Sequence, residues 1–321
     1  SVGKGEILGI VGESGSGKSV TSMSILRLLA DTARIKDGSI LFEGEDLTKL
    51  SKKQIRKIRG EKIAMIFQDP MSSLNPLIPV GKQVSEMIRE HHPDKSREEL
   101  KKEVMELFSR VRIPEPEKRY HSFPHEFSGG MRQRVVIAIA AACRPQILIC
   151  DEPTTALDVT IQAQILQLIR DLQKELGMSV IYITHDLGVV ANVADRVAVM
   201  YAGQIVEYGT VEEIFYDAWH PYTWALLQAL PQLGTKGEAL PTIDGTPPNL
   251  FNEIKGDAFA PRNKHALAID FVAEPPFFQV SETHAAKTWY LDPRAPKMER
   301  PHSIQNLREK MGKMGGSNLN G

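Results

Sequence analysis

Short, continuous apolar runs alternate along this chain with longer segments in which apolar residues recur every third or fourth position. A run of about four to eight apolar residues between turn signals is typical of a strand that is buried on both faces of a sheet. Such runs predict strands at residues 6–11, 39–42, 62–67, 146–150 and 178–184, and a hairpin at residues 196–201 and 204–208. Helical periodicity predicts helices at residues 20–29, 51–59, 132–142, 161–176 and 211–216. The alternation indicates an α/β fold.

The segment between residues 71 and 127 follows a different pattern, with short helices separated by prolines. Ser96 begins a capping box that is completed by Glu99, which is a typical start of a helix. Five apolar residues then repeat at helical spacing, namely Leu100, Val104, Leu107, Phe108 and Val111. We expect this stripe to pack in a core rather than to bind a ligand. The segment is therefore predicted to be a helical subdomain inserted in the α/β core.

A glycine-rich segment joins the first predicted strand to the first predicted helix. It fits the pattern G-x-x-x-x-G-K-[ST] at Gly12, Glu13, Ser14, Gly15, Ser16, Gly17, Lys18 and Ser19, with Val20 opening the helix. Glycine lets the backbone fold closely around a phosphate chain, and the N–H groups at a helix start attract anions. Lys18 would reach the β- and γ-phosphates, and Ser19 would ligate Mg²⁺. A plain glycine-rich turn is the alternative, but the flanking strand and helix favour a nucleotide site.

Polar residues stand at the ends of three later strands, where open α/β sheets bind ligands. Gln68 follows one strand, Asp151 and Glu152 follow the next, and His185 follows a third. Gln68 and Asp151 are candidate Mg²⁺ ligands beside Ser19. Glu152 is the candidate base that polarises the attacking water, and His185 is the candidate contact to the γ-phosphate. Read singly, these are ordinary surface or structural residues; their shared position downstream of a phosphate loop favours phosphate chemistry.

A second candidate anion site precedes the helix predicted for residues 132–142. The sequence there is Phe-Ser-Gly-Gly-Met, with Ser128, Gly129 and Gly130 at its centre. A serine and two glycines at a helix start expose N–H groups toward an anion. Taken alone, the segment favours an ordinary helix N-cap at Ser128. The apolar strand that follows, ending in Asp151 and Glu152, favours the functional interpretation.

The charge balance, the length of the apolar runs and the cysteines exclude several classes of protein. The chain has 321 residues, with 39 basic and 40 acidic side chains, a balance that favours neither nucleic-acid binding nor a polybasic membrane anchor. The longest unbroken apolar run, residues 135–143, is far shorter than the ~20 residues of a membrane span. The two cysteines, Cys143 and Cys150, lie in apolar stretches, so we expect buried thiols in a reducing cytosol rather than a disulfide.

Six segments occur in the order and approximate spacing of an ATP-binding cassette (ABC). They resemble its Walker A, Q-loop, signature, Walker B, D-loop and H-loop motifs, and they are residues 12–19, Gln68, residues 128–131, residues 147–152, residues 156–158 and His185. Met131 replaces the more common glutamine of the signature. The resemblance implies a P-loop NTPase fold, with a RecA-like core and a helical subdomain at about residues 71–135. It also implies that Ser128 and Gly130 act on the nucleotide of a partner subunit, and that Gly129 and Asp158 are among the nucleotide-binding residues.

The C-terminal part resembles the extension of oligopeptide and dipeptide importer ATPases, most closely the D-type subunit. The resemblance rests on residues 220–231, 245–250 and 259–262. It implies an ABC ATPase domain at residues 1–218, an extension at residues 219–305 and a disordered tail at residues 306–321. Relatives that hold an iron–sulfur cluster carry four cysteines in the extension. Because this chain has Asp257, Asn263, Asp270 and Thr288 at those places, we expect no cluster.

The resemblance implies the motor subunit of a bacterial importer that hydrolyses ATP with Mg²⁺. Expected partners are a related F-type ATPase, two membrane permease subunits and an extracellular peptide-binding protein. Membrane contact would run only through the permeases, at the cytoplasmic face of the cell membrane. Oligopeptides are the expected cargo; dipeptides, nickel or another small solute stay open.

A soluble ABC ATPase of DNA repair or translation is a rival, although the chain lacks a long coiled coil. The second rival is a small P-loop kinase or GTPase; the guanine-binding motif Asn-Lys-x-Asp is absent, and neither class explains residues 128–131. Most ATP-binding cassettes have an aromatic residue that contacts adenine upstream of the first strand. Because this chain leaves no room for one, we expect that its N-terminus is trimmed.

Overall fold

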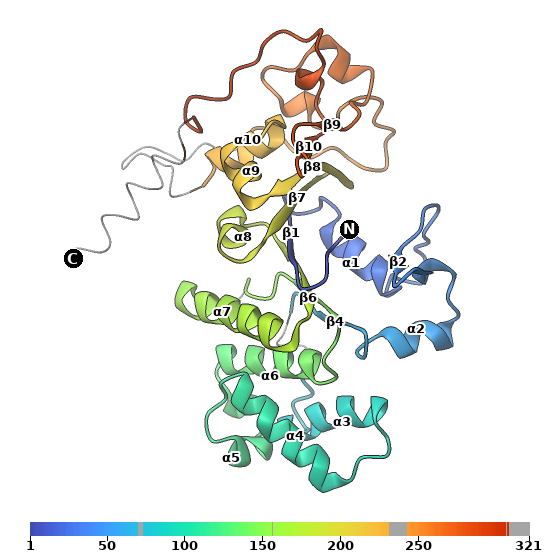
Figure 1. Cartoon of the computed structure of the whole chain (residues 1–321), viewed down its shortest axis with the longest axis vertical. Coiled ribbons are helices and arrows are strands. Elements are labelled where there is room, and N and C mark those ends of the chain that lie inside the picture. The colour runs from blue at the N-terminus through green and yellow to red at the C-terminus, as the bar shows by residue number, and fades with distance from the viewer. Residues whose placement is uncertain (70–72, 156, 231–242, 306, 308–321) are drawn as a thin grey trace, which may run out of the picture. The chain divides into compact units, whose positions relative to one another are not determined.

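The computed structural model describes residues 1–69, 73–155, 157–230, 243–305 and 307. The chain divides into two compact units, each built from two stretches. Unit 1 comprises Ser1–Ile7 and Ser19–Ile183, and unit 2 comprises Leu8–Lys18 and Thr184–Gly321. Figure 1 shows the elements of both units with the labels used below. Ala156 of the predicted D-loop, and residues 306 and 308–321 of the predicted disordered tail, lie outside the described residues.

The sheet of unit 1 consists of parallel strands in the order β4-β5-β6. Their bounds are β4 (Ile63–Ile66), β5 (Ile147–Asp151) and β6 (Ser179–Thr184). Ile63 pairs with Ile147, which in turn pairs with Ser179. All six residues of β6 are buried, which explains why these strands are apolar runs without alternation. The three strands predicted from those runs are confirmed, and β5 continues one residue further, to Asp151.

The first helix of the chain, α1 (Lys18–Ile25), ends four residues before the predicted end at residue 29. Arg27 takes a left-handed conformation with φ 51°, which an α-helix cannot continue through. A small antiparallel pair follows, β2 (Leu41–Phe42) with β3 (Glu45–Asp46). Strand β2 is shorter than the strand predicted at residues 39–42, and β3 was not predicted; the chain reverses between them at residues 43–44, both with positive φ. The predicted basic helix is confirmed as α2 (Lys52–Ile58).

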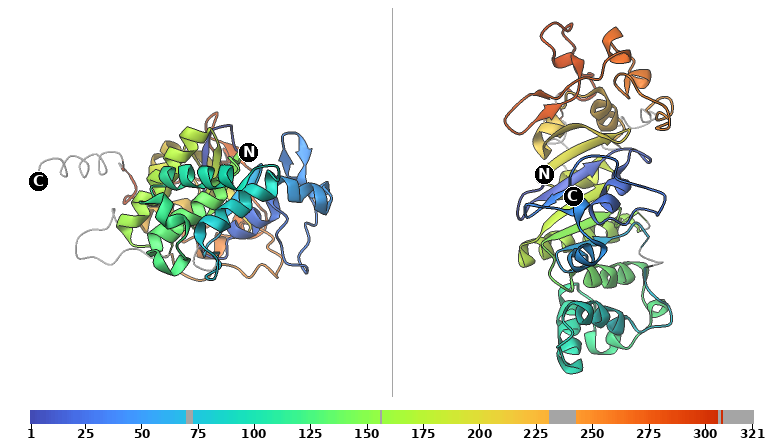
Figure 2. Two further views of the ribbon diagram at one scale, coloured as in Figure 1. Left: turned by 90° about the horizontal axis from the view of Figure 1, so that it is seen from below. Right: turned by 90° about the vertical axis from the view of Figure 1, so that its right-hand side faces the viewer.

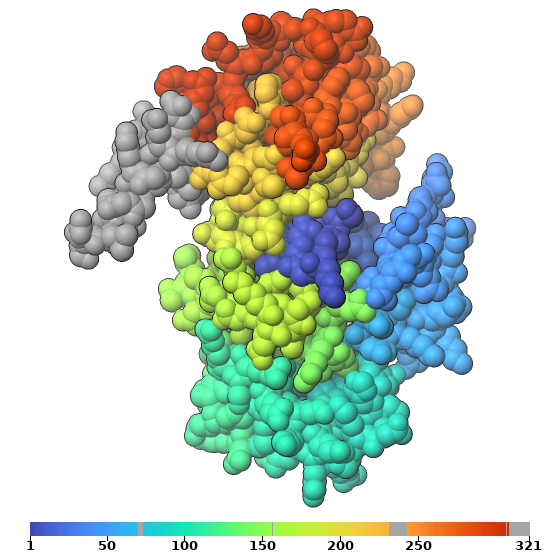
Figure 3. Space-filling model, viewed as in Figure 1, coloured from blue at the N-terminus to red at the C-terminus, as the bar shows by residue number. Residues whose placement is uncertain are grey.

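Helices α3 to α6 pack against one another in unit 1, as the ribbon view shows in cyan and green (Figure 2). Figure 3 draws the surface atoms of the same residues in the same colours. Their bounds are α3 (Val80–His91), α4 (Arg97–Arg110), α5 (Pro116–Tyr120) and α6 (Gly129–Ala141). The stripe predicted to form a core is buried throughout, from Leu100 to Val111, so that interpretation is confirmed. The capping box at Ser96 is present at the start of α4. Helix α6 begins at Gly129 rather than residue 132, because Ser128 caps it.

The longest helix of unit 1, α7 (Val159–Leu176), ends where the sequence predicts. Its buried stripe includes Ile165, Leu168, Ile169 and Leu172. Gly177 follows in the left-handed conformation, with φ 64°, and stops the helix. The helix begins two residues before the predicted position, because the Asp158 side chain accepts a hydrogen bond from the N–H of Ile161 and caps the first turn.

The sheet of unit 2 has the strand order β1-β7-β8-β10-β9. Strand β1 (Ile7–Val11) pairs in parallel with β7 (Arg196–Tyr201), and β7 forms the predicted hairpin with β8 (Gln204–Thr210). Strands β10 (Ala285–Ala286) and β9 (Phe278–Gln279) come from the C-terminal extension. Because Ala286 pairs with Glu207 of β8, the extension continues the sheet of the preceding part of the chain.

The helices of unit 2 are α8 (Leu187–Val193), α9 (Val211–Tyr216) and α10 (Pro221–Gln228). Helix α9 matches the predicted bounds, whereas α8 had no counterpart in the prediction. The extension also contains the 3₁₀ turns η4 (Ala260–Arg262), η5 (Ala268–Phe271) and η6 (Trp289–Leu291). Among the described helices of the whole chain, none combines the length and the hydropathy that crossing a bilayer requires.

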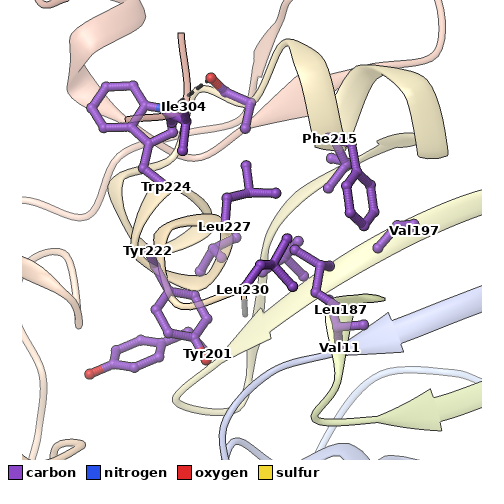
Figure 4. Close-up of a cluster of buried hydrophobic side chains, with 14 of the residues drawn as sticks. Val11, Leu187, Val197, Tyr201, Phe215, Tyr222, Trp224, Leu227, Leu230 and Ile304 are labelled. Atoms are coloured by element: carbon purple, nitrogen blue, oxygen red, sulfur yellow. Dashed lines mark hydrogen bonds between the residues drawn. The ribbon is translucent and has the colours of Figure 1, made fainter. Parts of the chain in front are cut away.

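A shared hydrophobic core joins β1 to the extension within unit 2 (Figure 4). Val11, at the end of β1, belongs to the same cluster as Val197 of β7. The extension contributes Tyr222 and Leu227 from α10, both essentially inaccessible to solvent. Burial of side chains of this size stabilises the fold by about 1.5–3 kcal/mol each. The extension therefore packs directly behind the strand that leads into the phosphate loop.

A buried carboxylate fixes the start of α10 to the sheet of unit 2. Glu207 of β8 accepts hydrogen bonds from the backbone N–H groups of Trp219 (2.7 Å) and His220 (3.1 Å). The Nε2 atom of His284 lies 2.8 Å from the same carboxylate, and both side chains are completely buried. Burial lowers the pKa of His220 to about 4, so this ring is neutral at physiological pH. The interior of the extension thus contains buried polar contacts as well as apolar packing.

The two cysteines are free thiols. Cys150 is buried in β5, as expected, whereas Cys143 is only partly buried. Burial raises the pKa of Cys143 to about 11 and also raises that of Cys150, so neither is a reactive thiolate near neutral pH.

Candidate functional site

The phosphate loop follows β1 in unit 2, and its path requires glycine at two positions. A Cβ atom on Gly12 would lie 2.1 Å from the carbonyl oxygen of Met200, a contact that no side chain tolerates. Gly17 has φ 100°, and a Cβ there would lie 3.2 Å from the Met200 side chain. The N–H of Gly203 donates to the carbonyl of Ser16 (2.9 Å), which ties the loop to the β7–β8 hairpin. Close backbone approach explains the glycines of the pattern.

Lys18 is buried at the centre of the loop, with 5% of its surface exposed. Its Nζ atom donates to the carbonyl oxygens of Gly12 (2.7 Å) and Glu13 (2.8 Å), and it lies 3.4 Å from Ser16 Oγ. Burying an ammonium is costly unless hydrogen bonds compensate it, and these contacts do so. The positive charge of Lys18 is thus fixed inside the phosphate loop by the loop's own carbonyl groups.

In unit 1, a hydrogen bond joins the start of α1 to the end of β5. Ser19 Oγ donates to Asp151 Oδ1 at 3.1 Å, and Asp151 is only 2% exposed. A hydroxyl and a carboxylate are oxygen ligands of the kind that Mg²⁺ prefers, and its remaining positions are commonly filled by water and phosphate oxygens. The donor set at this point therefore fits the ion that the sequence predicts. In the described part of the chain, no group of three or more His, Cys, Asp or Glu side chains is arranged to hold a metal.

Glu152 follows Asp151 and is held by two polar neighbours. Gln68 Nε2 donates to Glu152 Oε2 at 3.3 Å, and Thr155 Oγ1 donates to the same oxygen at 3.0 Å. The backbone of Glu152 is left-handed, with φ 46°, while its N–H donates to the carbonyl of Ile183 (2.9 Å). A left-handed non-glycine residue costs about 1–3 kcal/mol, and such strain is concentrated at functional sites.

Ser19, Gln68, Asp151 and Glu152 are therefore brought together within unit 1, as the sequence predicts. The pairing of Ile66 with Cys150 explains part of this, because it sets the ends of β4 and β5 side by side. His185 belongs to unit 2, where it is exposed between β6 and α8. The next residue, Asp186, caps α8 by accepting from the N–H of Gly188 (2.8 Å). The proposed contact of His185 with phosphate stays a prediction.

The signature segment starts α6, and Ser128 acts as its N-cap by accepting from the N–H of Met131 (3.3 Å). Ser128 and Asp158 are both exposed caps, at the starts of α6 and α7. A Cβ on Gly130 would lie 2.7 Å from Ile161 Cγ2, so glycine allows the two helices to approach closely. The N-cap interpretation is confirmed, and it is compatible with a further role toward a partner's nucleotide.

Sequence reasoning missed two residues that contact the phosphate loop within unit 2. Arg262 forms an ion pair with Glu13 at 2.6 Å, and the Tyr222 hydroxyl accepts from the Glu13 N–H at 2.7 Å. Both residues lie in segments that the resemblance singles out, at 259–262 and 220–231, but those segments carried no role. Because 249 positions separate Glu13 from Arg262, nothing local in the sequence connects them.

Two family profiles match the chain. The profile for "ABC transporter" matches residues 1–155, and that for "Oligopeptide/dipeptide transporter, C-terminal region" matches residues 206–269. The first contains the phosphate loop, Gln68, the signature and Asp151–Glu152, and the second contains Tyr222 and Arg262.

Curated relatives match over almost the whole chain. The oligopeptide transport ATP-binding protein OppD of Bacillus subtilis is 61% identical over 310 residues, which cover 96% of this chain and 86% of that protein. The dipeptide transport ATP-binding protein DppD of Lactococcus lactis is 57% identical over 301 residues, which cover 94% and 86%. The oligopeptide transport ATP-binding protein AmiE of Streptococcus pneumoniae is 56% identical, with 96% and 88% covered.

Solved structures of similar fold are ABC cassettes. A dimeric post-hydrolysis state of the cassette MJ0796, bound to ADP and Pi, is 30% identical with a TM-score of 0.58 and covers 66% of this chain and 88% of its own. The cassette cbiO1 from Clostridium perfringens, part of the transporter complex cbiONQ, is 31% identical with a TM-score of 0.59, and the coverage is 68% and 82%. With its phosphate loop, its strand-end carboxylates and its matched C-terminal region, this chain belongs to the family of oligopeptide and dipeptide ABC transporter ATP-binding proteins.

Proposed function

We propose that this chain is the ATP-hydrolysing motor subunit of a peptide importer. The observation that carries the proposal is the hydrogen bond between Ser19 and Asp151, because it places the last residue of the phosphate-loop motif beside the strand end that bears Glu152. The family is a family of transport ATPases, and both MJ0796 with ADP and Pi and the named relatives support the same reaction. We propose ATP as substrate and Mg²⁺ as its accompanying ion.

In this proposal, Lys18 exchanges its contacts with loop carbonyls for the β- and γ-phosphate oxygens of ATP. Ser19 and Asp151 would hold Mg²⁺, with Gln68 as a further ligand. Bound Mg²⁺ would neutralise charge on the phosphates. Glu152 accepts a proton from the attacking water, and its hydrogen bonds from Gln68 and Thr155 keep the carboxylate oriented.

The proposed reaction needs a second ATPase subunit. Ser128 and Gly130 would cover the nucleotide of that partner, while the partner's signature covers this one. The physical reason is that one phosphate loop surrounds only part of the triphosphate charge. A second helix N-terminus supplies further N–H donors and excludes water, which strengthens both electrostatic interactions and positioning. His185 would contribute a hydrogen bond to the γ-phosphate.

The named relatives support an importer of peptides as the setting. We propose a related F-type ATPase as the partner and two permease subunits as the membrane component. An extracellular peptide-binding protein would deliver the cargo. The helical subdomain predicted at residues 71–127 would receive the permeases, so the chain would sit at the cytoplasmic face of the membrane. The ATPase domain is proposed to span residues 1–218, and the extension residues 219–305.

The experiment that tests this function is to purify the chain from cells together with whatever membrane subunits bind it. ATP hydrolysis is then measured in the reconstituted complex, with and without peptide and its binding protein. We expect two permeases and a second ATPase to co-purify and peptide to raise the hydrolysis rate. Stimulation by nickel or another solute in place of peptide would mean that this solute is the cargo. Co-purification with nucleic acid instead of permeases would refute the proposal that the chain is part of an importer.

A further inference from the structure

The extension reaches back to the phosphate loop through one arginine. Arg262 Nη1 donates to Glu13 Oε2 (2.6 Å) and Nη2 donates to Glu13 Oε1 (3.0 Å), which is a bidentate pair. The Arg262 side chain is 4% exposed and that of Glu13 is 27% exposed. A bidentate guanidinium–carboxylate pair of this kind fixes both position and orientation. All residues of this arrangement lie in unit 2.

Arg262 is itself held by the rest of the extension and by β7. It donates to the carbonyl oxygens of Asp244 (2.9 Å) and Ile243 (3.2 Å), and to the Tyr201 hydroxyl (3.2 Å). Its guanidinium lies over the rings of Tyr201 and Phe259, 5.8 and 5.9 Å from their centroids. The hydrogen bonds to Glu13 raise the pKa of Arg262, which stays charged. The arginine is therefore preorganised rather than a mobile surface side chain.

Tyr222 holds the backbone of the same loop residue. Its hydroxyl accepts the Glu13 N–H at 2.7 Å, and its ring is completely buried. The ring lies 4.5 Å from that of Tyr201 and 5.3 Å from that of Phe259, measured between centroids, and Figure 4 shows Tyr201 and Tyr222 side by side. Burial raises the pKa of Tyr222, so the hydroxyl remains protonated.

Glu13 is consequently the link between the extension and the lysine of the phosphate loop. Its carboxylate is bound by Arg262 and its N–H by Tyr222, while its carbonyl accepts from Lys18 Nζ (2.8 Å) and from the N–H of Ser16 (3.2 Å). A displacement of Glu13 would move a carbonyl that positions Lys18. In addition, a Glu13 carboxylate without its guanidinium would place an uncompensated negative charge in the loop that receives a triphosphate.

We propose that Arg262 and Tyr222 of the C-terminal extension are positioning residues for ATP: they fix Glu13 and neutralise its charge, and so set the affinity of the phosphate loop. This inference rests on the proposed function, because it needs ATP to bind at Lys18. It gives the extension a role in nucleotide binding that is separate from any contact with other subunits. Neither residue touches the phosphates in this account.

The test is equilibrium binding of a fluorescent ATP analogue with Mg²⁺ to the full chain. We expect Arg262→Gln to raise the Kd about tenfold, because Glu13 loses both its orientation and its counter-charge. The double variant with Glu13→Gln should recover most of that loss, to within about threefold of wild type, since no uncompensated charge remains. A purely structural role for Arg262 would give no such rescue. Tyr222→Phe, which removes only the acceptor of the Glu13 N–H, should raise the Kd about threefold.

Arg294→Ala is the matched control, because Arg294 is an exposed arginine of the same extension, paired with Asp292. Its Kd should equal that of wild type. If Arg262→Gln does not fold, Arg262→Lys keeps the charge without the bidentate geometry and should raise the Kd about threefold. Wild-type affinity in these Arg262 variants, or a double variant no tighter than Arg262→Gln, would overturn this inference alone. Absence of ATP binding by the wild-type chain would overturn the proposed function as well.

Discussion

Lys18→Ala is expected to weaken ATP binding by about a hundredfold or more. The lysine is the cation at the centre of the phosphate loop, where it is held by the carbonyls of Gly12 and Glu13. Charge-assisted hydrogen bonds contribute about 1.5–3 kcal/mol each, so losing two of them to the phosphates corresponds to at least this factor. Isothermal titration calorimetry with ATP and Mg²⁺ measures the effect directly.

Lys49→Ala is the control for that measurement, because Lys49 is an exposed lysine whose ion pair with Asp46 lies at the surface. Its ATP affinity should be unchanged. Circular dichroism and thermal unfolding establish that both variants are folded before affinities are compared. If Lys18→Ala and wild type bind ATP with equal affinity, the phosphate loop is not part of the ATP-binding site.

Glu152→Gln is expected to bind ATP as wild type does but to lose about 10²–10⁴ of the hydrolysis rate. Glutamine fills the same space and can still accept the hydrogen bonds that Gln68 and Thr155 donate to Glu152. It cannot accept a proton from water at neutral pH, so the chemical step alone should fail. With ATP and the partner ATPase, the unhydrolysed pair should accumulate in its closed form. Phosphate release measures the first effect, and light scattering measures the second.

The matched control is Glu175→Gln, at a half-exposed glutamate that pairs with Arg110 away from the strand ends. It should turn over at the wild-type rate. Normal turnover by Glu152→Gln would mean that another group accepts the proton. Loss of ATP binding together with turnover would instead mean that the substitution disturbs the site as a whole.

Much of the fold follows from local patterns because the local physical causes are strong. Strand β6 is buried at every position, so an apolar run was sufficient to predict it. The capping box at Ser96 and the left-handed Gly177 mark helix ends through their own chemistry. Strand β3 was missed because a two-residue strand is too short to show periodicity. Helix α8 was missed because most of its residues are buried, which removes the polar face from its sequence pattern.

The candidate site was predicted where motifs and strand ends coincide. Ser19, Asp151, Gln68 and Glu152 meet in unit 1 because consecutive strands of a parallel sheet end at one edge. The pair of Glu13 and Arg262 could not be predicted in this way, since it depends on how the extension folds onto β7 and β8. The left-handed backbone conformation of Glu152 could not be predicted from the sequence either, because glutamate rarely adopts this conformation.

We propose that this chain holds Mg²⁺ and ATP through the residues of the phosphate-loop motif and through Asp151 at the end of β5. Electron paramagnetic resonance with Mn²⁺ in place of Mg²⁺ tests it most directly. In the presence of ATP and the wild-type chain, the account predicts a protein-bound Mn²⁺ spectrum with hyperfine coupling to phosphorus, which Asp151→Asn and Ser19→Ala abolish. A spectrum that matches Mn²⁺ and ATP in buffer alone, or one that is unchanged in both variants, would contradict the account.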